Sequence, residues 1–388
     1  MEKKTKTKVQ WVLVLGTACT WFGQHCGAGF ASGAQVTKYF ATSGWKAIFM
    51  TLIPFVILGV VMYLMSEYVR RTGARGYKDV ALSLYSKNSA VGRVMLFVWD
   101  VSLLLNIFIS GGAVVAGCST LLNQTLGIPY VLASVIFAAI VALICMFGAK
   151  VMARVSLGIV SVLIAALCIV AFALLSKNWS YLGEILGQRQ TFGASPPLTL
   201  TNTIFYVGIG STFIVPLTSM ACEFKSKKDS KVMAISGALM NGLTLLFVTL
   251  AVLTGMPAAM ESNLPVLDML NANFSSTGPL AIVYQLALFL AYLTMADVFA
   301  AIQRYGTMIN KKGKFNQTIV DGILCVLFLL CAILIAQFGL KVLVDKGYKI
   351  QSFLRIPLYV VCTLIFVPIR LHQMKKKKLA APEAQEQA

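Results

Sequence analysis

Closely spaced glycines interrupt a hydrophobic stretch near the start of the chain, within the segment Gln24-His25-Cys26-Gly27-Ala28-Gly29-Phe30-Ala31-Ser32-Gly33. A helix in lipid must satisfy its own backbone hydrogen bonds, so a break there is costly unless the freed groups bind something. The N–H groups that open a second half-helix after such a break form an anion site, which suits a carboxylate. Glycines also let a ligand approach the backbone closely. The predicted substrate contacts of this segment are His25, Cys26, Gly27, Ala28 and Gly29; the alternative interpretation is tight helix packing.

A second glycine-rich interruption occurs in the middle of the chain, at Phe205-Tyr206-Val207-Gly208-Ile209-Gly210-Ser211-Thr212. We expect Gly208 and Gly210 to expose backbone and Ser211 to add a hydroxyl beside it. The rings of Phe205 and Tyr206 are candidate walls of an apolar pocket, with an aromatic packing face as the alternative. When a chain consists of two sets of hydrophobic spans, a pair of such breaks in corresponding spans of the two sets indicates the binding site of a transporter.

Polar residues inside three other hydrophobic stretches are further candidates. Asp100 and Asp297 each lie seven residues from an arginine at the end of their stretch, roughly 10 Å inside that boundary at about 1.5 Å per residue. Two neighbouring carboxylates in a low dielectric can hold a shared proton, whereas the alternative is that each bonds to an adjacent helix. Asn106 and Ser110 share one helical face and are candidate substrate contacts. Arg355 is expected to close an outer gate or to reach the outer surface.

The composition places the chain among membrane proteins. Of its 388 residues 58% are hydrophobic and only 12% charged, and the mean hydropathy is +0.80. The net charge of +19 does not indicate nucleic acid, because the basic residues lie in short loops on alternate sides of the hydrophobic stretches. The nine cysteines lack metal-type spacing, so no metal other than Na⁺ and no cofactor is expected.

Ten hydrophobic spans are long enough to cross a bilayer, at about 11–40, 45–69, 92–121, 128–148, 152–176, 198–221, 232–256, 279–305, 316–338 and 350–371. One side of these spans holds 25 of the 33 Lys and Arg residues, which places both termini in the cytoplasm. Five plus five spans predict an inverted repeat, with residues 11–176 and 198–371 as the two halves. Residues 177–197 are then an extracellular connection, and residues 1–10 and 372–388 are cytoplasmic tails, the second beside anionic membrane lipid.

Two short segments resemble a known family. Gly27-Ala28-Gly29-Phe30 resembles the Gly-Ser/Ala-Gly-x-Phe first-helix motif of amino acid–polyamine–organocation (APC) transporters. The longer string to Gly33 is similar to that of YkvI-like bacterial membrane proteins, as are residues 111–117 and 127–130. The chain departs from that branch at Ala34-Gln35, where a Gln-Glu pair is usual, so an acidic role is absent there. The resemblance implies a LeuT-type inverted repeat with broken helices 1 and 6, that is, an all-α membrane protein and a secondary active transporter.

The resemblance also implies where a coupling ion would bind. Sodium-coupled relatives hold a cation between helices 1 and 8, and the matching residues here are Gln24, Gly27, Ala291, Thr294 and Asp297. Some proton-coupled relatives carry a lysine in the middle of helix 5, and none stands in the middle of span 152–176. This difference slightly favours Na⁺ over H⁺, and Asp100 with Asp297 stays the candidate proton site.

The resulting prediction is a symporter for a small amino acid or related amine in the bacterial cytoplasmic membrane, with no enzymatic activity. A ligand sensor on the same fold, which would bind without flux, and an uncoupled exchanger are the alternatives. The sequence does not define the oligomeric state.

Overall fold

The computed structural model describes residues 9–85, 89–146, 149–293, 296–311 and 313–385, without the side chains of 144–157, 296–301, 303 and 376–385. No strand occurs among these residues. The principal helices are α1 (Trp11–His25), α2 (Ala28–Ala31), α3 (Ala34–Tyr39), α4 (Ala47–Thr72), α5 (Tyr77–Leu84), α6 (Ala90–Leu126), α7 (Tyr130–Met146), α8 (Ala149–Lys177), α9 (Trp179–Gly187), α10 (Pro196–Gly210), α11 (Ile214–Met220), α12 (Lys227–Leu253), α13 (Pro265–Asn273), α14 (Pro279–Leu293), α15 (Ala296–Ile309), α16 (Gln317–Ala336), α17 (Leu340–Val342), α18 (Tyr348–Arg355) and α19 (Cys362–Gln385).

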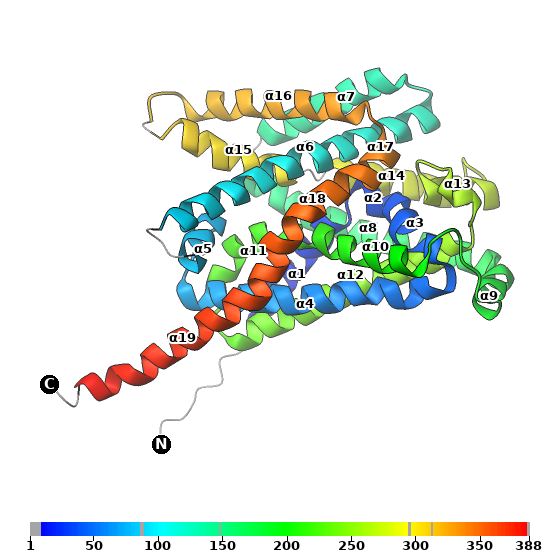
Figure 1. Ribbon diagram of the computed structural model, residues 1–388. Coiled ribbons are helices and arrows are strands. Elements are labelled where there is room, and N and C mark those ends of the chain that lie inside the picture. Colours follow the sequence, from blue (N-terminus) through cyan, green and yellow to red (C-terminus); the bar gives the residue numbers. More distant parts are fainter. Residues whose placement is uncertain (1–8, 86–88, 147–148, 294–295, 312, 386–388) are drawn as a thin grey trace.

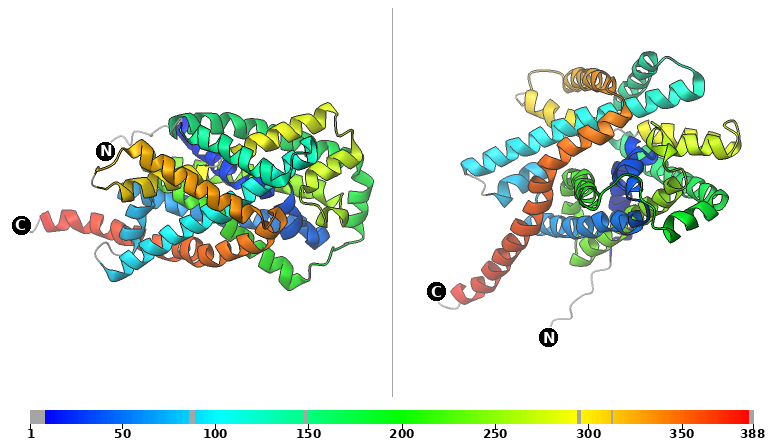
Figure 2. Two further views of the ribbon diagram at one scale, coloured as in Figure 1. Left: turned by 90° about the horizontal axis from the view of Figure 1, so that it is seen from above. Right: turned by 45° about the vertical axis from the view of Figure 1, so that its right-hand side comes forward.

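The helices form two packed groups joined by long diagonal elements (Figure 1). One group contains α6, α7, α15 and α16, and the other contains α1, α4, α8 and α12. Helices α10 and α18 pack together between the groups, and α14 contacts both α6 and α8. The start of α1 and the end of α19 lie toward the same end of the molecule (Figure 2), as an even number of spans would require.

Seven helical segments of the described chain are long and apolar enough to cross a membrane: Ala41–Thr72, Ala90–Leu126, Gly158–Lys177, Pro196–Glu223, Lys227–Leu253, Gln317–Ala336 and Leu340–Lys375. Tyr130–Leu143 and Pro279–Leu293 are shorter apolar helices. The predicted segment 11–40 is divided into three helices, each too short to count as a full span. The total of ten spans and the division into two five-helix repeats stay predictions.

The predicted break in the first span is confirmed. Helix α1 ends at His25, Cys26 has φ −78° and ψ 47°, and Gly27 is extended with φ −76° and ψ −166°. A second break follows at Gly33, whose φ of +88° lies in the left-handed region that favours glycine. The first span is therefore a helix, one helical turn and a second short helix, and each junction contains a glycine.

The predicted break in the middle span takes a weaker form than expected, because the α-helix ends at Gly210 but the backbone does not unwind. Both glycines lie within α10, and the chain continues through a 3₁₀ turn at Ser211–Phe213 into α11 with helical dihedral angles. A methyl group added at Gly208 would lie 2.6 Å from Cβ of Ser352, and one added at Gly210 would lie 2.5 Å from Cδ1 of Leu58. These glycines allow neighbouring helices to approach closely, so they do not expose backbone to a ligand.

The last span contains two π-helical segments. One runs over Leu343–Gly347 and the other over Ile356–Val361, directly after Arg355. Pro357 has no backbone N–H and therefore cannot donate in the helical ladder at this point. Such π segments are frequent at functional sites.

Candidate functional site

The break in the first span is linked to the middle of α10 by a hydrogen bond. Nε2 of His25, the last residue of α1, lies 2.9 Å from the hydroxyl of Tyr206. Both residues are buried, His25 at 7% and Tyr206 at 0% exposure. A buried polar group is costly without such a partner, so this bond fixes the orientation of the His25 ring.

Aromatic rings surround the imidazole of His25. Phe55 of α4 meets it edge-on with the ring centres 5.0 Å apart, and Phe30 of α2 lies at 5.2 Å. Tyr206 in turn packs against Phe40 at 4.6 Å between ring centres. The wall therefore combines the first span, α1 and α2, with α4 and α10, which lie farther along the sequence.

The turn that follows the break packs against α6 and α14. A methyl group added at Gly117 would lie 3.3 Å from Cβ of Ala28 and 2.9 Å from the hydroxyl of Tyr292. The hydroxyl of Tyr284 donates to the carbonyl of Ala31 at 2.6 Å. The missing side chain of Gly117 thus leaves the space that Ala28 and Tyr292 occupy.

The glycines of the first break differ in their surroundings. A methyl group on Gly29 would lie 2.6 Å from Cγ of Gln35, so Gly29 is a packing glycine. A methyl group on Gly27 would meet no atom within 4 Å. Gly27 also caps α2 without a side-chain hydrogen bond, and Cys26 before it is 1% exposed. Tight packing therefore does not account for Gly27.

The outer loop covers the second junction of the first span. The N–H of Val266 in α13 donates to the carbonyl of Ser32 at 3.1 Å, and a methyl group on Gly33 would lie 2.7 Å from Cγ2 of Val266. Farther along the chain, Lys38 pairs with Asp345 at 3.0 Å. The predicted outer end of the site is thus closed by α13 and by contacts with the last span.

A separate polar cluster joins α6, the 3₁₀ turn and α18. Arg355 is 2% exposed, and it donates to Oδ1 of Asn106 at 2.5 Å and to Oγ1 of Thr212 at 2.7 Å. Ser110 donates to Asn106 at 2.9 Å and accepts from Gln351 at 3.3 Å. Arg355 is therefore a buried bridge between spans, and the expected position at the outer surface is wrong.

Several predicted site residues lie away from His25. Asn106 is eleven residues from Gly117 on α6, about 16 Å along the helix, and belongs to the Arg355 cluster. Phe205 directly precedes Tyr206 in the helix, so its side chain points about 100° away from that of Tyr206. Its ring centre lies 4.9 Å from that of Phe353, a residue that is 68% exposed. The Ser211 hydroxyl donates to the carbonyl of Gly208 at 2.7 Å. The predictions that Phe205 walls the pocket and that Ser211 offers its hydroxyl to a ligand are therefore wrong.

Asp100 is bound in an ion pair. Arg304 donates to both carboxylate oxygens at 3.1 and 3.2 Å, and the hydroxyl of Tyr77 donates at 2.5 Å. Burial and the hydrogen bond to this carboxylate raise the pKa of Tyr77 in α5 well above its usual value, so its hydroxyl stays a donor. These partners differ from the predicted proton shared with Asp297, whose side chain lies outside the described residues.

The other predicted ion ligands are only partly described. Gln24 is half-buried in the last turn of α1, and Ala291 is buried on α14 beside Tyr292. Thr294 lies outside the described residues. In the part of the chain that is described, no three His, Cys, Asp or Glu side chains are placed to hold a metal ion.

Three aromatic residues that were not expected from the sequence complete the surroundings of the break, namely Phe55, Tyr284 and Tyr292. Their positions in the sequence gave no signal, since aromatic residues are common throughout such spans.

Sequence comparison finds no matching family model. The uncharacterized membrane protein YkvI of Bacillus subtilis is 24% identical over 243 residues, which are 60% of this chain and 62% of YkvI, less than two thirds of that relative. This similarity confirms the resemblance that the first-helix motif predicts.

Solved structures of transporters share the fold. MhsT in complex with L-phenylalanine has a TM-score of 0.66 at 14% identity, covering 92% of this chain and 96% of that one. The inward-facing conformation of Mhp1 has a TM-score of 0.63 at 15% identity, covering 89% and 75%. A mutant of the Eremococcus coleocola manganese transporter has a TM-score of 0.64 at 15% identity, covering 94% and 81%. The chain is therefore a multi-pass membrane protein with the LeuT-type fold, and these similar structures are transporters rather than enzymes.

Proposed function

We propose that the chain is a secondary transporter of a small amino acid or related amine, and that Na⁺ is the coupling ion. The observation that carries the proposal is the buried break at Cys26–Gly27, beside the hydrogen bond between His25 and Tyr206. The molecules bound in two structures of this fold, L-phenylalanine in MhsT and bromovinylhydantoin in Mhp1, support a small organic substrate.

The break offers both kinds of group that a zwitterion needs. The C-terminal end of α1 carries the negative end of its helix dipole and attracts a cation, whereas the first N–H groups of α2 attract a carboxylate. Gly27 leaves room for a ligand to reach this backbone, since a methyl group there would meet no atom within 4 Å. The faces of Phe30 and Phe55 add an apolar wall that also favours an ammonium group.

The contacts on either side of the break support alternating access. Toward the predicted outside, α13 covers Ser32, and Lys38 pairs with Asp345. Toward the predicted inside, Asp100, Arg304 and Tyr77 join α5, α6 and α15. Transport requires that these two sets of contacts open in turn around the break.

A ligand screen by thermal unfolding tests the proposal. Purified protein in detergent is heated with each amino acid and with common amines, in NaCl and in choline chloride. A ligand that binds the folded state raises the melting temperature by mass action. We expect one compound or one chemical group of compounds to stabilise the protein, and to do so in NaCl only.

The outcomes separate the parts of the proposal. A shift equal in both salts contradicts sodium coupling and directs attention to proton coupling or exchange. Ligand binding without uptake into proteoliposomes contradicts transport and supports a sensor. No shift with any compound contradicts the amino acid assignment.

A further inference from the structure

A groove runs along the outer surface of the bundle between α4 and α12. Its volume is about 510 Å³, within the range of about 300–1,000 Å³ that small-molecule sites occupy. The groove is lined by Phe55, Val56, Gly59, Val60, Tyr63, Lys227, Lys231, Ala234, Ile235, Ala238 and Leu239. It is distinct from the break in the first span, with Phe55 as the one residue common to the two.

Small residues form the floor of the groove. A methyl group added at Gly59 would lie 3.2 Å from Cβ of Ala238, so α4 and α12 approach closely there. The flanks are larger and face outward, with Val56 at 67% and Leu239 at 55% exposure. A shallow floor between raised apolar flanks suits a flexible hydrocarbon chain.

One end of the groove is basic. Lys227 and Lys231 are exposed and one helical turn apart on α12, and Tyr63 adds a hydroxyl from α4. Across the described chain, neither lysine forms an ion pair. The opposite end, around Phe55 and Leu239, contributes only apolar side chains.

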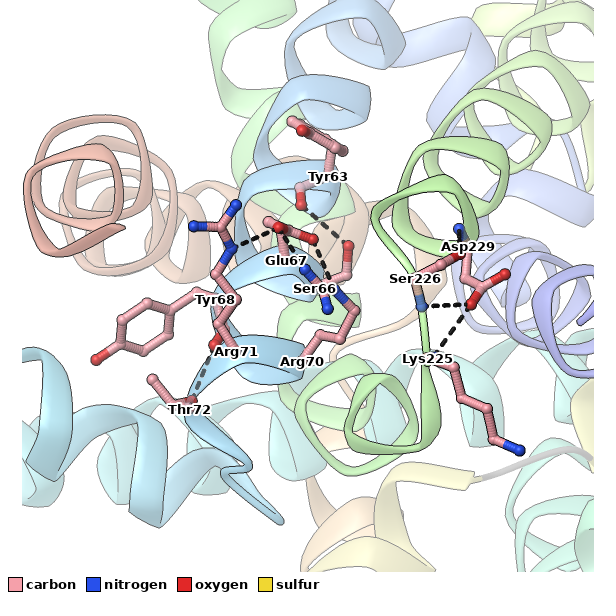
Figure 3. Close-up of polar contacts among 10 residues, drawn as sticks. All are labelled: Tyr63, Ser66, Glu67, Tyr68, Arg70, Arg71, Thr72, Lys225, Ser226 and Asp229. Atoms are coloured by element: carbon pink, nitrogen blue, oxygen red, sulfur yellow. Dashed lines mark hydrogen bonds and ion pairs between the residues drawn. The ribbon is translucent and has the colours of Figure 1, made fainter. Parts of the chain in front are cut away.

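The nearby carboxylates Asp229 and Glu67 are already engaged by other groups (Figure 3). Asp229 is buried and accepts from the backbone N–H groups of Gln10, Lys225 and Ser226 at 2.8–3.1 Å. Glu67 is 2% exposed and accepts from Arg70 at 2.7 Å and from Arg71 at 2.6 Å. Neither carboxylate forms an ion pair with Lys227 or Lys231, which leaves both ammonium groups available to an anionic ligand.

The length of the groove matches one lipid leaflet. From Lys227 to Leu239 is twelve residues of helix, about 18 Å at 1.5 Å per residue. Half of the hydrocarbon core is about 15 Å thick. A lipid with its phosphate at the lysines would therefore lay one acyl chain along the whole apolar floor.

We propose that this groove binds an anionic phospholipid, with the phosphate at Lys227 and Lys231 and one acyl chain against Gly59, Ala234 and Ala238. A second copy of the chain fits less well. A two-fold axis along the membrane normal would place the same basic end of each copy against the other, which brings like charges together. The phospholipid instead supplies the missing negative charge and the apolar chain in one molecule.

Photolabelling tests the site. The protein is reconstituted in phosphatidylcholine nanodiscs that contain phosphatidylglycerol with a diazirine in its acyl chain, and the labelled residues are identified by mass spectrometry. We expect labelling enriched at Val56, Val60, Ile235 and Leu239 over the equally exposed Ile323 and Val326 of α16. Unlabelled phosphatidylglycerol should compete, and phosphatidylcholine should not.

Two pairs of lysine substitutions separate the groove from charge in general. The K227Q/K231Q variant should bind phosphatidylglycerol about 30-fold more weakly, because each lysine near an anionic headgroup strengthens binding about fivefold. The K311Q/K314Q variant loses two exposed lysines between α15 and α16 and should keep the labelling. A Val60→Trp variant, which fills the groove with both lysines intact, should also lose it.

Three results would overturn the proposal. They are equal labelling of the groove and of α16, unchanged labelling in K227Q/K231Q, and protection of the groove by a cross-linked second copy. None of these readouts depends on transport, so the lipid site stands or fails independently of the proposed function.

Discussion

The hydrogen bond between His25 and Tyr206 gives the sharpest test of the proposed site. The Tyr206→Phe variant removes only the hydroxyl and keeps the ring that packs against Phe40 and Phe55. The Nε2 atom of His25 then loses its 2.9 Å partner in a buried position. Leaving one buried polar group unsatisfied costs about 1–3 kcal/mol.

The control is a tyrosine with the same kind of bond far from the break. Tyr130 on α7 donates to the carbonyl of Ala336 at 2.6 Å, so Tyr130→Phe also removes one interhelical hydrogen bond. Both variants should lose stability to a similar extent. Only Tyr206→Phe should also weaken the ligand, by about 5- to 150-fold for 1–3 kcal/mol.

The assay measures the two effects separately. Unfolding without ligand gives the stability of each variant, and titration with the stabilising compound from the screen gives its affinity. The reasoning is refuted if Tyr206→Phe keeps the wild-type affinity while losing stability, because the hydroxyl would then serve the fold alone. It is also refuted if Tyr130→Phe weakens the ligand equally.

Three further predictions concern single positions. Gly27→Ala should fold with unchanged stability, because the added methyl meets no atom within 4 Å, but should abolish ligand stabilisation in the thermal screen; unaltered binding would contradict the assignment of the break as the site. Gly208→Ala should destabilise by about 1–3 kcal/mol in chemical unfolding, since the methyl would lie 2.6 Å from Cβ of Ser352. The matched Gly158→Ala, with no atom within 4 Å, should instead be neutral or stabilising by up to about 1 kcal/mol, and equal effects of the two would count against the packing role. A double-mutant cycle of Asp100→Asn and Arg304→Gln should give a coupling energy of about 1.5–3 kcal/mol, as expected for a charged, half-buried hydrogen-bonded pair, and strictly additive losses would show that the pair is not coupled.

The sequence predicted those features that depend on the backbone alone. In lipid a helix must satisfy its own hydrogen bonds, so the run from Gly27 to Gly33 indicated a break, and the structure places the breaks at Gly27 and Gly33. At Gly208 and Gly210 the chain stays helical, and only a 3₁₀ turn follows Gly210. A glycine permits a break without requiring one, and there the close approach of Ser352 and Leu58 uses the missing side chains for packing.

Polar partners could not be read from the sequence, because they join residues far apart in the chain. Asp100 meets Arg304 across 204 positions, and Arg355 meets Asn106 across 249. The sequence indicated that each of these polar groups needed a partner inside an apolar span. Which partner it found depends on how the helices cross.

The sequence by itself determined the membrane class and the broken first span, since mean hydropathy and glycine spacing act within single segments. The tertiary structure alone decided that His25 meets Tyr206 and that Phe205 packs against Phe353 instead. The physical reason is that a helix turns consecutive side chains by about 100°, so neighbouring residues meet different partners. Only the packing of α1, α4, α10 and α12 selects the face that forms the site.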